Sequence, residues 1–315
     1  MNWQFFKMRC LVTGASGHVG AFLTKCLLAR GSEVAVLVRP QSDLWRIADV
    51  LGQITVLHGV LGDLTAANGK LEAWGPDTVF HLAWSGVTGA YRNDPAQITR
   101  NVAGSLELFD AARKAGMNTW VGFGSQAEYG SVDDLLTEDM TPRPATAYGV
   151  AKHCLAVMIE KLCAMTETRF LWLRLLAAYG PMDDPRHLLP TVIEQLIDGV
   201  RPALTPGEQL WDYLYIDDAI EAVCRLAQQT SATGVFNLGS GKAQSVRSIV
   251  EQIRNLIDPA LPLGFGDVPY RSDQVMHLQA DITKLKAATG WTPQISLLEG
   301  LQRTIDWHRK QRETQ

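Results

Sequence analysis

The chain has 315 residues, of which 46% are hydrophobic and 20% are charged, and its formal net charge is -4. This composition is that of an ordinary globular protein and excludes intrinsic disorder, a collagen-like repeat and a coiled coil. The 29 basic and 33 acidic residues leave no broad basic face, so we expect no nucleic-acid partner.

The cysteines and the lengths of the apolar runs indicate the expected cellular location. The five cysteines form no CxxC pair and lie in apolar stretches, so we expect reduced core thiols and a cytoplasmic location. No apolar run reaches the roughly 18 residues of a membrane-spanning helix, so no membrane partner is expected. Residues 1–7 are too short and too mixed for a signal peptide. No metal site is predicted.

The first half of the chain alternates apolar, β-rich runs with segments whose apolar residues recur every three or four positions. The predicted strands span residues 8–13, 33–38, 54–59, 77–82, 118–123 and 168–175. Strands that are apolar throughout and separated by helices indicate a parallel sheet covered on both faces. We therefore predict an α/β fold with a doubly wound, Rossmann-type parallel sheet.

The alternation stops after about residue 176, where a smaller C-terminal substrate-binding domain is expected to begin. Predicted helices span 147–165, 187–199, 217–228, 245–257 and 297–310. We expect about 213–240 to return to the sheet. The predicted dinucleotide-binding domain thus consists of residues 1–176 and about 213–240. The predicted substrate domain consists of about 177–212 and 241–315.

Three glycines stand where the first strand meets the first helix, in LVTGASGHVG (11–20). Gly14 permits a tight turn, Gly17 lets the backbone approach a pyrophosphate, and Gly20 allows the helix to pack closely on the strand. The free N–H groups at the start of the helix would face the anion. The predicted phosphate-binding turn is completed by Ser16, His18 and Val19.

The end of the second strand indicates which dinucleotide fits. An NAD site usually has an acidic residue there, whereas an NADP site offers a cation to the 2′-phosphate. This chain has Arg39 at that point, with Ser42 and Arg46 close behind. The sequence therefore favours NADP(H), and NAD(H) held without a carboxylate is the alternative. After the third strand, Asp63 and Leu64 of a GDL triplet are expected to contact the adenine.

Tyr148 and Lys152 stand four residues apart on a predicted helix, so their side chains share one face. A tyrosine with a pKa of about 10 is a poor base at neutral pH, and a neighbouring ammonium favours its phenolate. Ser125 follows the fifth strand at its carboxyl end, where ligands bind in open α/β sheets. A hydroxyl there can bind a substrate oxygen while Tyr148 transfers the proton. Ser125, Tyr148 and Lys152 are therefore the predicted catalytic residues.

Several segments resemble the extended short-chain dehydrogenase/reductases, and among them the NAD-dependent epimerase/dehydratase relatives that act on nucleotide sugars. They are TGASGHVG (13–20), HLAW (81–84), NVAGSLELFDAARKAG (101–116), GSQAEYG (124–130), YGVAK (148–152), RLLAAYGP (174–181), DYLYIDDAIEAV (212–223), FNLGSG (236–241) and the stretch 271–293. The resemblance implies a Rossmann domain for the cofactor and a C-terminal domain for a nucleoside diphosphate-sugar. It also implies a homodimer formed through helices 94–115 and 147–165.

The resemblance also implies roles for individual residues. Ser125, Tyr148 and Lys152 match the family's Ser/Thr-Tyr-Lys set. The segment that lines the cofactor after the fourth strand is matched by Leu82, Ala83 and Trp84. Asn101 matches a helix asparagine near the nicotinamide half, and Arg271 matches an arginine that meets the substrate diphosphate. Gln126 and His187 are further expected substrate-binding residues.

Departures from the family narrow the chemistry. Family 4,6-dehydratases carry Asp-Glu directly after the catalytic serine or threonine, where this chain has Gln126 and Ala127. Glutamine cannot protonate a leaving hydroxyl and alanine cannot abstract a proton, so we expect no dehydratase. Enzymes of the GDP-fucose synthase type use a cysteine at the position of Ala127 with a distant histidine, which His187 resembles. Without that cysteine, C3/C5 epimerisation is not expected.

Hydride transfer at a single carbinol remains. We expect reduction of a 4-keto-6-deoxy nucleotide sugar by NADPH with Tyr148 as the acid, and a 4-epimerase with tightly bound NAD+ is the alternative. A non-catalytic NAD(P)-binding sensor or scaffold is a third hypothesis, in which a Tyr148→Phe variant would keep its binding response. Ala177 and Trp211 depart from the family's substrate-side residues, so CDP, GDP, UDP and dTDP sugars all stay open.

Overall fold

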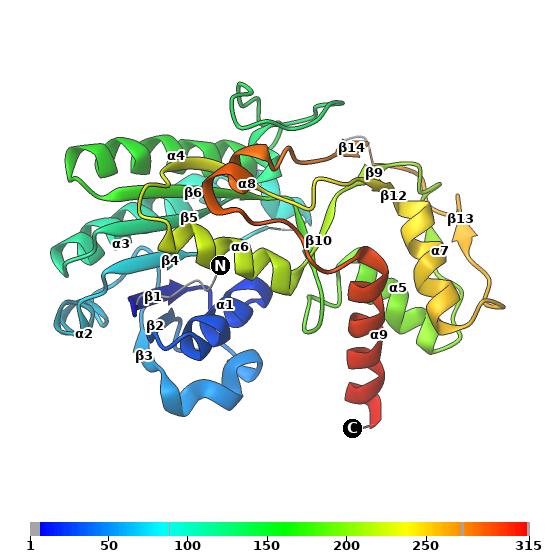
Figure 1. Ribbon diagram of the computed structural model, residues 1–315, viewed down its shortest axis with the longest axis horizontal. Coiled ribbons are helices and arrows are strands. Elements are labelled where there is room, and N and C mark those ends of the chain that lie inside the picture. Colours follow the sequence, from blue (N-terminus) through cyan, green and yellow to red (C-terminus); the bar gives the residue numbers. More distant parts are fainter. Residues whose placement is uncertain (1–6, 88, 272–273, 314–315) are drawn as a thin grey trace.

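The structure is a computed structural model that describes residues 7–87, 89–271 and 274–313. Within these ranges a seven-stranded parallel sheet has the strand order β11-β6-β5-β4-β1-β2-β3 (Figure 1). Its strands are β1 (Arg9–Thr13), β2 (Glu33–Val38), β3 (Thr55–His58), β4 (Thr78–His81), β5 (Thr119–Ser125), β6 (Arg169–Leu175) and β11 (Gly234–Leu238). The predicted doubly wound Rossmann sheet is confirmed.

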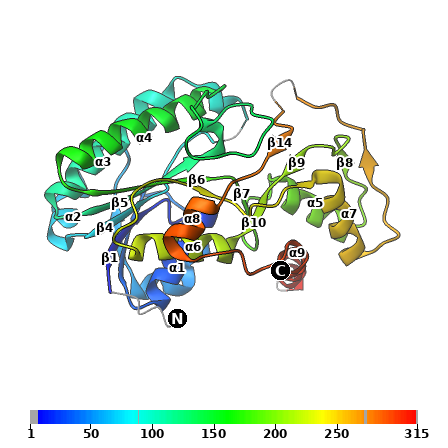
Figure 2. The same cartoon turned by 45° about the horizontal axis from the view of Figure 1, so that its top comes forward.

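Helices cover both faces of this sheet (Figure 2). α3 (Ala103–Lys114) and α4 (Ala147–Met165) lie on one face, and α1 (His18–Ala29) and α6 (Ile216–Gln228) lie on the other. α2 (Asn68–Trp74) packs against α3. Because both faces are covered, the central strands are apolar throughout, and β5 is buried along its whole length.

A smaller lobe follows in the second half of the chain, at the other end of the molecule from α2 and α3 (Figure 1). Its helices are α5 (Leu188–Ile197), α7 (Val246–Ile257) and α9 (Leu297–Glu313). Its short strands are β8 (Ala203–Leu204), β9 (Leu210–Trp211), β12 (Gln244–Ser245), β13 (Gly264–Phe265) and β14 (His277–Leu278). β9 pairs with β12 and β14, while β8 pairs with β13.

The chain passes between the two parts more than once. β7 (Ala177–Tyr179) and β10 (Tyr213–Tyr215) pair in parallel as a separate two-stranded sheet, after which α6 packs on α1. β11 then joins the edge of the large sheet beside β6, so the expected return to the sheet is made by β11. α8 (Thr283–Thr289) packs on α6 and β11 through the buried Leu285, although we assigned this stretch to the substrate domain. The domain division of the rest of the chain stays a prediction.

The helix predicted over 147–165 is confirmed as α4. Its N-cap is Thr146, whose Oγ1 accepts a hydrogen bond from Gly149 N at 3.2 Å. The helix also corrects one expectation, because Cys154 lies on its exposed side with Val157 and Met158 and is not a core thiol.

Two features are absent from the described ranges. None of the helices there combines the length and the apolar character needed to cross a membrane. Nor do three or more His, Cys, Asp or Glu side chains in those ranges gather in a way that could hold a metal ion.

Candidate active site

The glycine-rich turn between β1 and α1 brings backbone segments closer than side chains would allow. Gly14 has a φ of +75°, and a Cβ on it would lie 2.8 Å from Ala83 N. A Cβ on Gly20 would lie 2.2 Å from Gly14 O, so the helix packs directly on the turn. The turn therefore presents backbone N–H groups at the start of α1, an arrangement that suits a pyrophosphate.

A cleft of about 600 Å³ opens over this turn, and we call it the cofactor cleft. Most of the predicted cofactor residues lie in its wall, namely Gly14, Ser16, Gly17, Arg39, Ser42, Leu82, Ala83, Trp84 and Asn101. Gly59, Val60 and Leu61 line the side where Asp63 and Leu64 were expected. Asp63 lies in a turn of its own, in which its Oδ1 accepts from Thr65 N at 3.3 Å. The Leu64 side chain is fully buried in the core.

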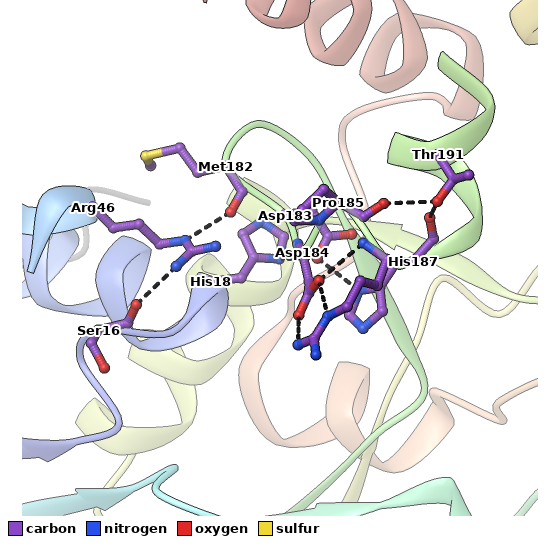
Figure 3. A network of polar contacts seen from close by, with 10 residues as sticks. Ser16, His18, Arg46, Met182, Asp183, Asp184, Pro185, His187 and Thr191 are labelled. Carbon is purple, nitrogen blue, oxygen red and sulfur yellow. Dashed lines mark hydrogen bonds and ion pairs between the residues drawn. The ribbon is translucent and has the colours of Figure 1, made fainter. Parts of the chain in front are cut away.

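The two arginines after β2 have different positions. Arg39 is exposed and lines the cofactor cleft. Arg46 donates from Nη1 to Ser16 O at 3.1 Å and from Nε to Met182 O at 2.9 Å (Figure 3). Arg46 therefore ties the glycine-rich turn to the loop 180–187, and of the two arginines it is Arg39 that faces the cleft.

A second cleft, of about 750 Å³, begins at the same turn and is bounded on its other side by the smaller lobe. We call it the substrate cleft. It brings together the predicted catalytic and substrate-binding residues Ser125, Gln126, Tyr148, Lys152, His187 and Arg271. Its wall also includes the remaining residues of the predicted turn, which are His18, Val19 and Gly20. The structure thus brings these residues together, and Gly14 and Gly17 line both this cleft and the cofactor cleft.

Tyr148 is surrounded by an aromatic ring, a cation and a hydroxyl. The ring of Trp84 meets it edge-on with centroids 6.1 Å apart, and the Arg92 guanidinium carbon lies 5.2 Å from the phenol centroid. Burial raises the pKa of Tyr148, while a hydrogen bond with Ser125 and the charge of Arg92 lower it. Sequence reasoning missed Arg92, because no motif marks it and only the fold brings it to the phenol.

Lys152 lies on the inner face of α4 and is 4% exposed. Its Nζ donates to Phe123 O at 2.6 Å and lies 3.8 Å from the centroid of the Trp84 ring. Burial lowers the pKa of Lys152 to about 7, and the nearby Glu128 carboxylate acts in the opposite direction. In this structure the ammonium is therefore held by the end of β5 and an aromatic face.

Ser125 ends β5 and caps the short helix η4 (Gln126–Glu128). Its Oγ accepts from Ala127 N at 3.2 Å, and its own N donates to Glu128 Oε1 at 2.9 Å. This reciprocal pattern is a capping box, for which the spacing S-x-x-E is a local sequence signal. Glu128 was not among the predicted site residues, although this spacing is visible in the sequence.

Asn101 contributes to the cofactor cleft by holding a loop. It is buried on the π-helical turn η3 (Gln97–Val102), a kind of helix irregularity that often occurs at functional sites. Its Oδ1 accepts from Ser85 N and its Nδ2 donates to Ser85 O, both at 2.9 Å. Gln97 Oε1 accepts from Trp84 Nε1 at 2.7 Å. Asn101 and Gln97 together fix the loop that carries Trp84.

A carboxylate between two histidines lies where the glycine-rich turn meets the loop 180–187 (Figure 3). Asp183 Oδ1 is 2.9 Å from His187 Nδ1 and 3.3 Å from His18 Nδ1. Burial raises the pKa of Asp183, but the hydrogen bonds from both imidazoles outweigh it and hold that pKa below its ordinary value. The bond to Asp183 in turn raises the pKa of His187. His187 is half exposed in the substrate cleft, so it can carry a proton toward a bound anion.

Known proteins are similar to this chain in sequence and in structure. A match to the family described as NAD dependent epimerase/dehydratase spans residues 10–239. The dTDP-glucose 4,6-dehydratase of Streptomyces griseus is 28% identical over 316 residues, which cover 96% of this chain and 94% of that protein. The UDP-glucose 4-epimerase of Corynebacterium glutamicum is 30% identical over 308 residues, or 91% of each chain. A solved structure of the Thermus thermophilus UDP-glucose 4-epimerase in complex with NAD has a TM-score of 0.83 at 25% identity, and covers 96% of this chain and 99% of that one.

Proposed function

Because the chain belongs to the NAD-dependent epimerase/dehydratase family, we propose that it reduces C4 of a 4-keto-6-deoxy nucleoside diphosphate-sugar with NADPH. One observation carries this proposal. Ser125, Tyr148 and Lys152 lie together in the substrate cleft, while the two positions beside Ser125 hold Gln126 and Ala127. The site therefore has the groups for proton transfer at one oxygen and lacks, at those two positions, an acid and a base for eliminating water.

The cofactor cleft fits a dinucleotide. The close backbone approaches at Gly14 and Gly20 leave room for a pyrophosphate at the turn. Arg39 and Ser42 line the end where a 2′-phosphate would lie, and the described residues of the wall include no Asp or Glu. A cation without a carboxylate supports NADP(H) over NAD(H). NAD(H) is the alternative, since the solved Thermus thermophilus relative holds NAD.

The residues of the site supply the proton chemistry. The bound dinucleotide supplies the hydride to C4. Ser125 Oγ accepts from Ala127 N, so its own proton is available to the carbonyl oxygen of the sugar. Tyr148 then donates its phenolic proton to that oxygen as the alcohol forms. The Arg92 guanidinium, which lies against the phenol ring, stabilises the phenolate that remains until solvent returns the proton.

The lining of the substrate cleft supports a 6-deoxy sugar joined to a diphosphate. Apolar and aromatic side chains form one part of the wall, and they are Val87, Leu175, Leu176, Ala177, Trp211 and Tyr213. Such a surface suits a methyl group at C6 better than a hydroxymethyl group. Arg186, His187 and Arg271 lie elsewhere in the same wall and suit a diphosphate.

A 4-epimerase is the second candidate, favoured by the relatives of that name in Corynebacterium glutamicum and Thermus thermophilus. It would use the same Ser125, Tyr148 and Lys152 for both directions of proton transfer. The relative from Streptomyces griseus is named a dehydratase, but Gln126 and Ala127 argue against that reaction here. A non-catalytic sensor or scaffold is a third hypothesis, and the assembled catalytic set argues against it.

We further propose that the protein forms a homodimer through α3 and α4. α4 exposes Val150, Val157 and Met158 along one side, an apolar strip of the kind that marks an interaction surface. Analytical ultracentrifugation tests this proposal, because a Val157→Glu variant should sediment as a monomer. A cytoplasmic location stays a prediction.

Two measurements test the proposed reaction. The nucleotide released on denaturing the purified protein should be absent or a substoichiometric NADP(H), whereas stoichiometric NAD+ would favour the 4-epimerase. NADPH oxidation should then be seen with 4-keto-6-deoxy nucleotide sugars and should be lost in Tyr148→Phe. An unchanged rate in that variant would remove Tyr148 from the mechanism.

A further inference from the structure

A buried ion pair lies behind the catalytic serine. Glu128, at the end of η4, is fully buried, and Arg174, on β6, is 3% exposed. Arg174 Nε lies 2.9 Å from Glu128 Oε2. Neither side chain is among the described residues that line the cofactor cleft or the substrate cleft. Contact with substrate or cofactor therefore does not explain the pair.

The carboxylate connects the ion pair to Ser125. Glu128 Oε1 accepts from Ser125 N at 2.9 Å and from Trp172 Nε1 at 3.0 Å, and Oε2 lies 3.2 Å from the same indole nitrogen. A Cβ at Gly124 would lie 2.3 Å from Glu128 Oε1 and 2.3 Å from Trp172 Nε1. The glycine thus leaves the space into which the carboxylate fits against the end of β5.

Stability alone is a weak reason for such an arrangement. A buried ion pair often gives no more stability than apolar side chains of similar volume would. One of the hydrogen bonds of Glu128 is, however, accepted from the backbone N of Ser125, whose side chain lines the substrate cleft. The carboxylate also faces the catalytic helix, since its charge acts on Lys152 and Tyr148 of α4 as well as pairing with Arg174.

We propose that Glu128 is a positioning residue whose carboxylate, anchored by Arg174 and Trp172, fixes the Ser125 backbone so that Ser125 Oγ faces the reacting oxygen beside Tyr148. This inference rests on the proposed function, because the reaction makes the position of that hydroxyl matter. A displacement of about 1 Å at such a group can lower a rate by about 100-fold. Glu128 would therefore act on turnover without touching the substrate.

The first test is the variant Glu128→Gln, which keeps the shape of the side chain and removes its charge. We expect kcat to fall by about 10- to 100-fold while KM changes by less than about threefold, because binding groups stay in place. Glu138→Gln is the matched control. Glu138 Oε1 accepts from Asn237 N at 2.8 Å and gives a nearby carboxylate without a hydrogen bond to Ser125. The control should keep kcat within about twofold of wild type.

The second test is the double variant Glu128→Leu/Arg174→Met, which removes both charges and keeps apolar volume, so that no unpaired charge unfolds it. We expect it to fold while kcat stays at least about tenfold down. Crystal structures of the ligand-free wild type and double variant should show Ser125 Oγ displaced by about 0.5 Å or more. Recovery of kcat to within about twofold, or an unmoved Oγ, overturns the proposal. The structural readout decides even if the wild type reduces no keto sugar, an outcome that would defeat the proposed function alone.

Discussion

Lys152 is a buried cation, and its replacement by methionine should stabilise the ligand-free protein in a pH-dependent way. Burial lowers the pKa of this side chain from 10.5 to about 7 in the folded state. In the unfolded chain the lysine keeps its ordinary pKa. Below pH 7 both states hold the proton, so the full cost of burying the charge is present. Between pH 7 and 10.5 the unfolded state binds more protons, so stability rises with pH in that window.

The size of the effect follows from these values. Between pH 6 and pH 9 the folded state gives up its proton over about two pH units, which raises the free energy of unfolding by about 2.7 kcal/mol. Methionine does not titrate, so the Lys152→Met variant lacks this rise. At pH 6 the variant avoids the cost of burying the charged lysine, which is roughly 4–5 kcal/mol. It loses about 1–3 kcal/mol because Phe123 O, which lies 2.6 Å from the Lys152 Nζ in the wild type, is left without a hydrogen-bond donor. We therefore expect a net gain of about 1–4 kcal/mol at pH 6.

Urea unfolding of the wild type and of Lys152→Met at pH 6, 7, 8 and 9 measures this difference. Lys161→Met is the matched control, because Lys161 is exposed on the same helix and its variant should follow the wild type. The two stability curves should converge as the pH rises. If wild type and Lys152→Met show the same change in unfolding free energy between pH 6 and pH 9, the reasoning about this buried ammonium is refuted.

Three further predictions concern the cofactor cleft. Arg39→Ala should raise KM for NADPH about tenfold, the worth of one charge-assisted contact, and leave KM for NADH nearly unchanged; equal effects on both cofactors would contradict a 2′-phosphate contact. Gly20→Ala should lower Tm by at least about 5 °C and abolish cofactor binding, because its Cβ would lie 2.2 Å from Gly14 O. If the Gly20→Ala variant melted at the wild-type Tm, the helix would have room for the added methyl group, contrary to this prediction. Arg46→Ala should weaken cofactor binding about tenfold by releasing the glycine-rich turn from the loop 180–187, and calorimetry showing wild-type affinity would exclude this linking role.

Most of the features predicted from the sequence depend on local patterns. The alternation of buried strands and helices, the glycine turn at Gly14 and the Tyr148–Lys152 spacing are all set within a few residues, so they can be recognised without the fold. Asp63 shows the limit of such patterns. The GDL triplet beside the third strand folds into a turn, and Asp63 is not among the described residues that line the cofactor cleft, so its contact with the adenine stays a prediction. The burial of the neighbouring Leu64 side chain could not be predicted from the triplet either, because it depends on packing in the core beneath the cleft.

Long-range contacts account for what the sequence did not predict. Arg92 reaches the Tyr148 ring and Asp183 joins His18 to His187 only because the fold brings separate loops together. The lowered pKa of Lys152 was also not predicted. It depends on how deeply the side chain is buried, and a four-residue spacing does not show depth of burial. Glu128 is an intermediate case, because its capping box is local while its partner on β6 is distant in sequence.

The fate of the transferred hydrogen tests the proposed reaction most directly. The protein is incubated with NADPH that carries deuterium on the transferring face and with a 4-keto-6-deoxy nucleotide sugar, and the product is examined by NMR and mass spectrometry. Reduction at C4 predicts one deuterium at C4 for each NADPH consumed, and Tyr148→Phe should abolish the transfer. Conversion of a 4-hydroxy nucleotide sugar to its C4 epimer, with its own hydrogen retained at C4 and no NADPH consumed, would contradict the reductase and establish the 4-epimerase.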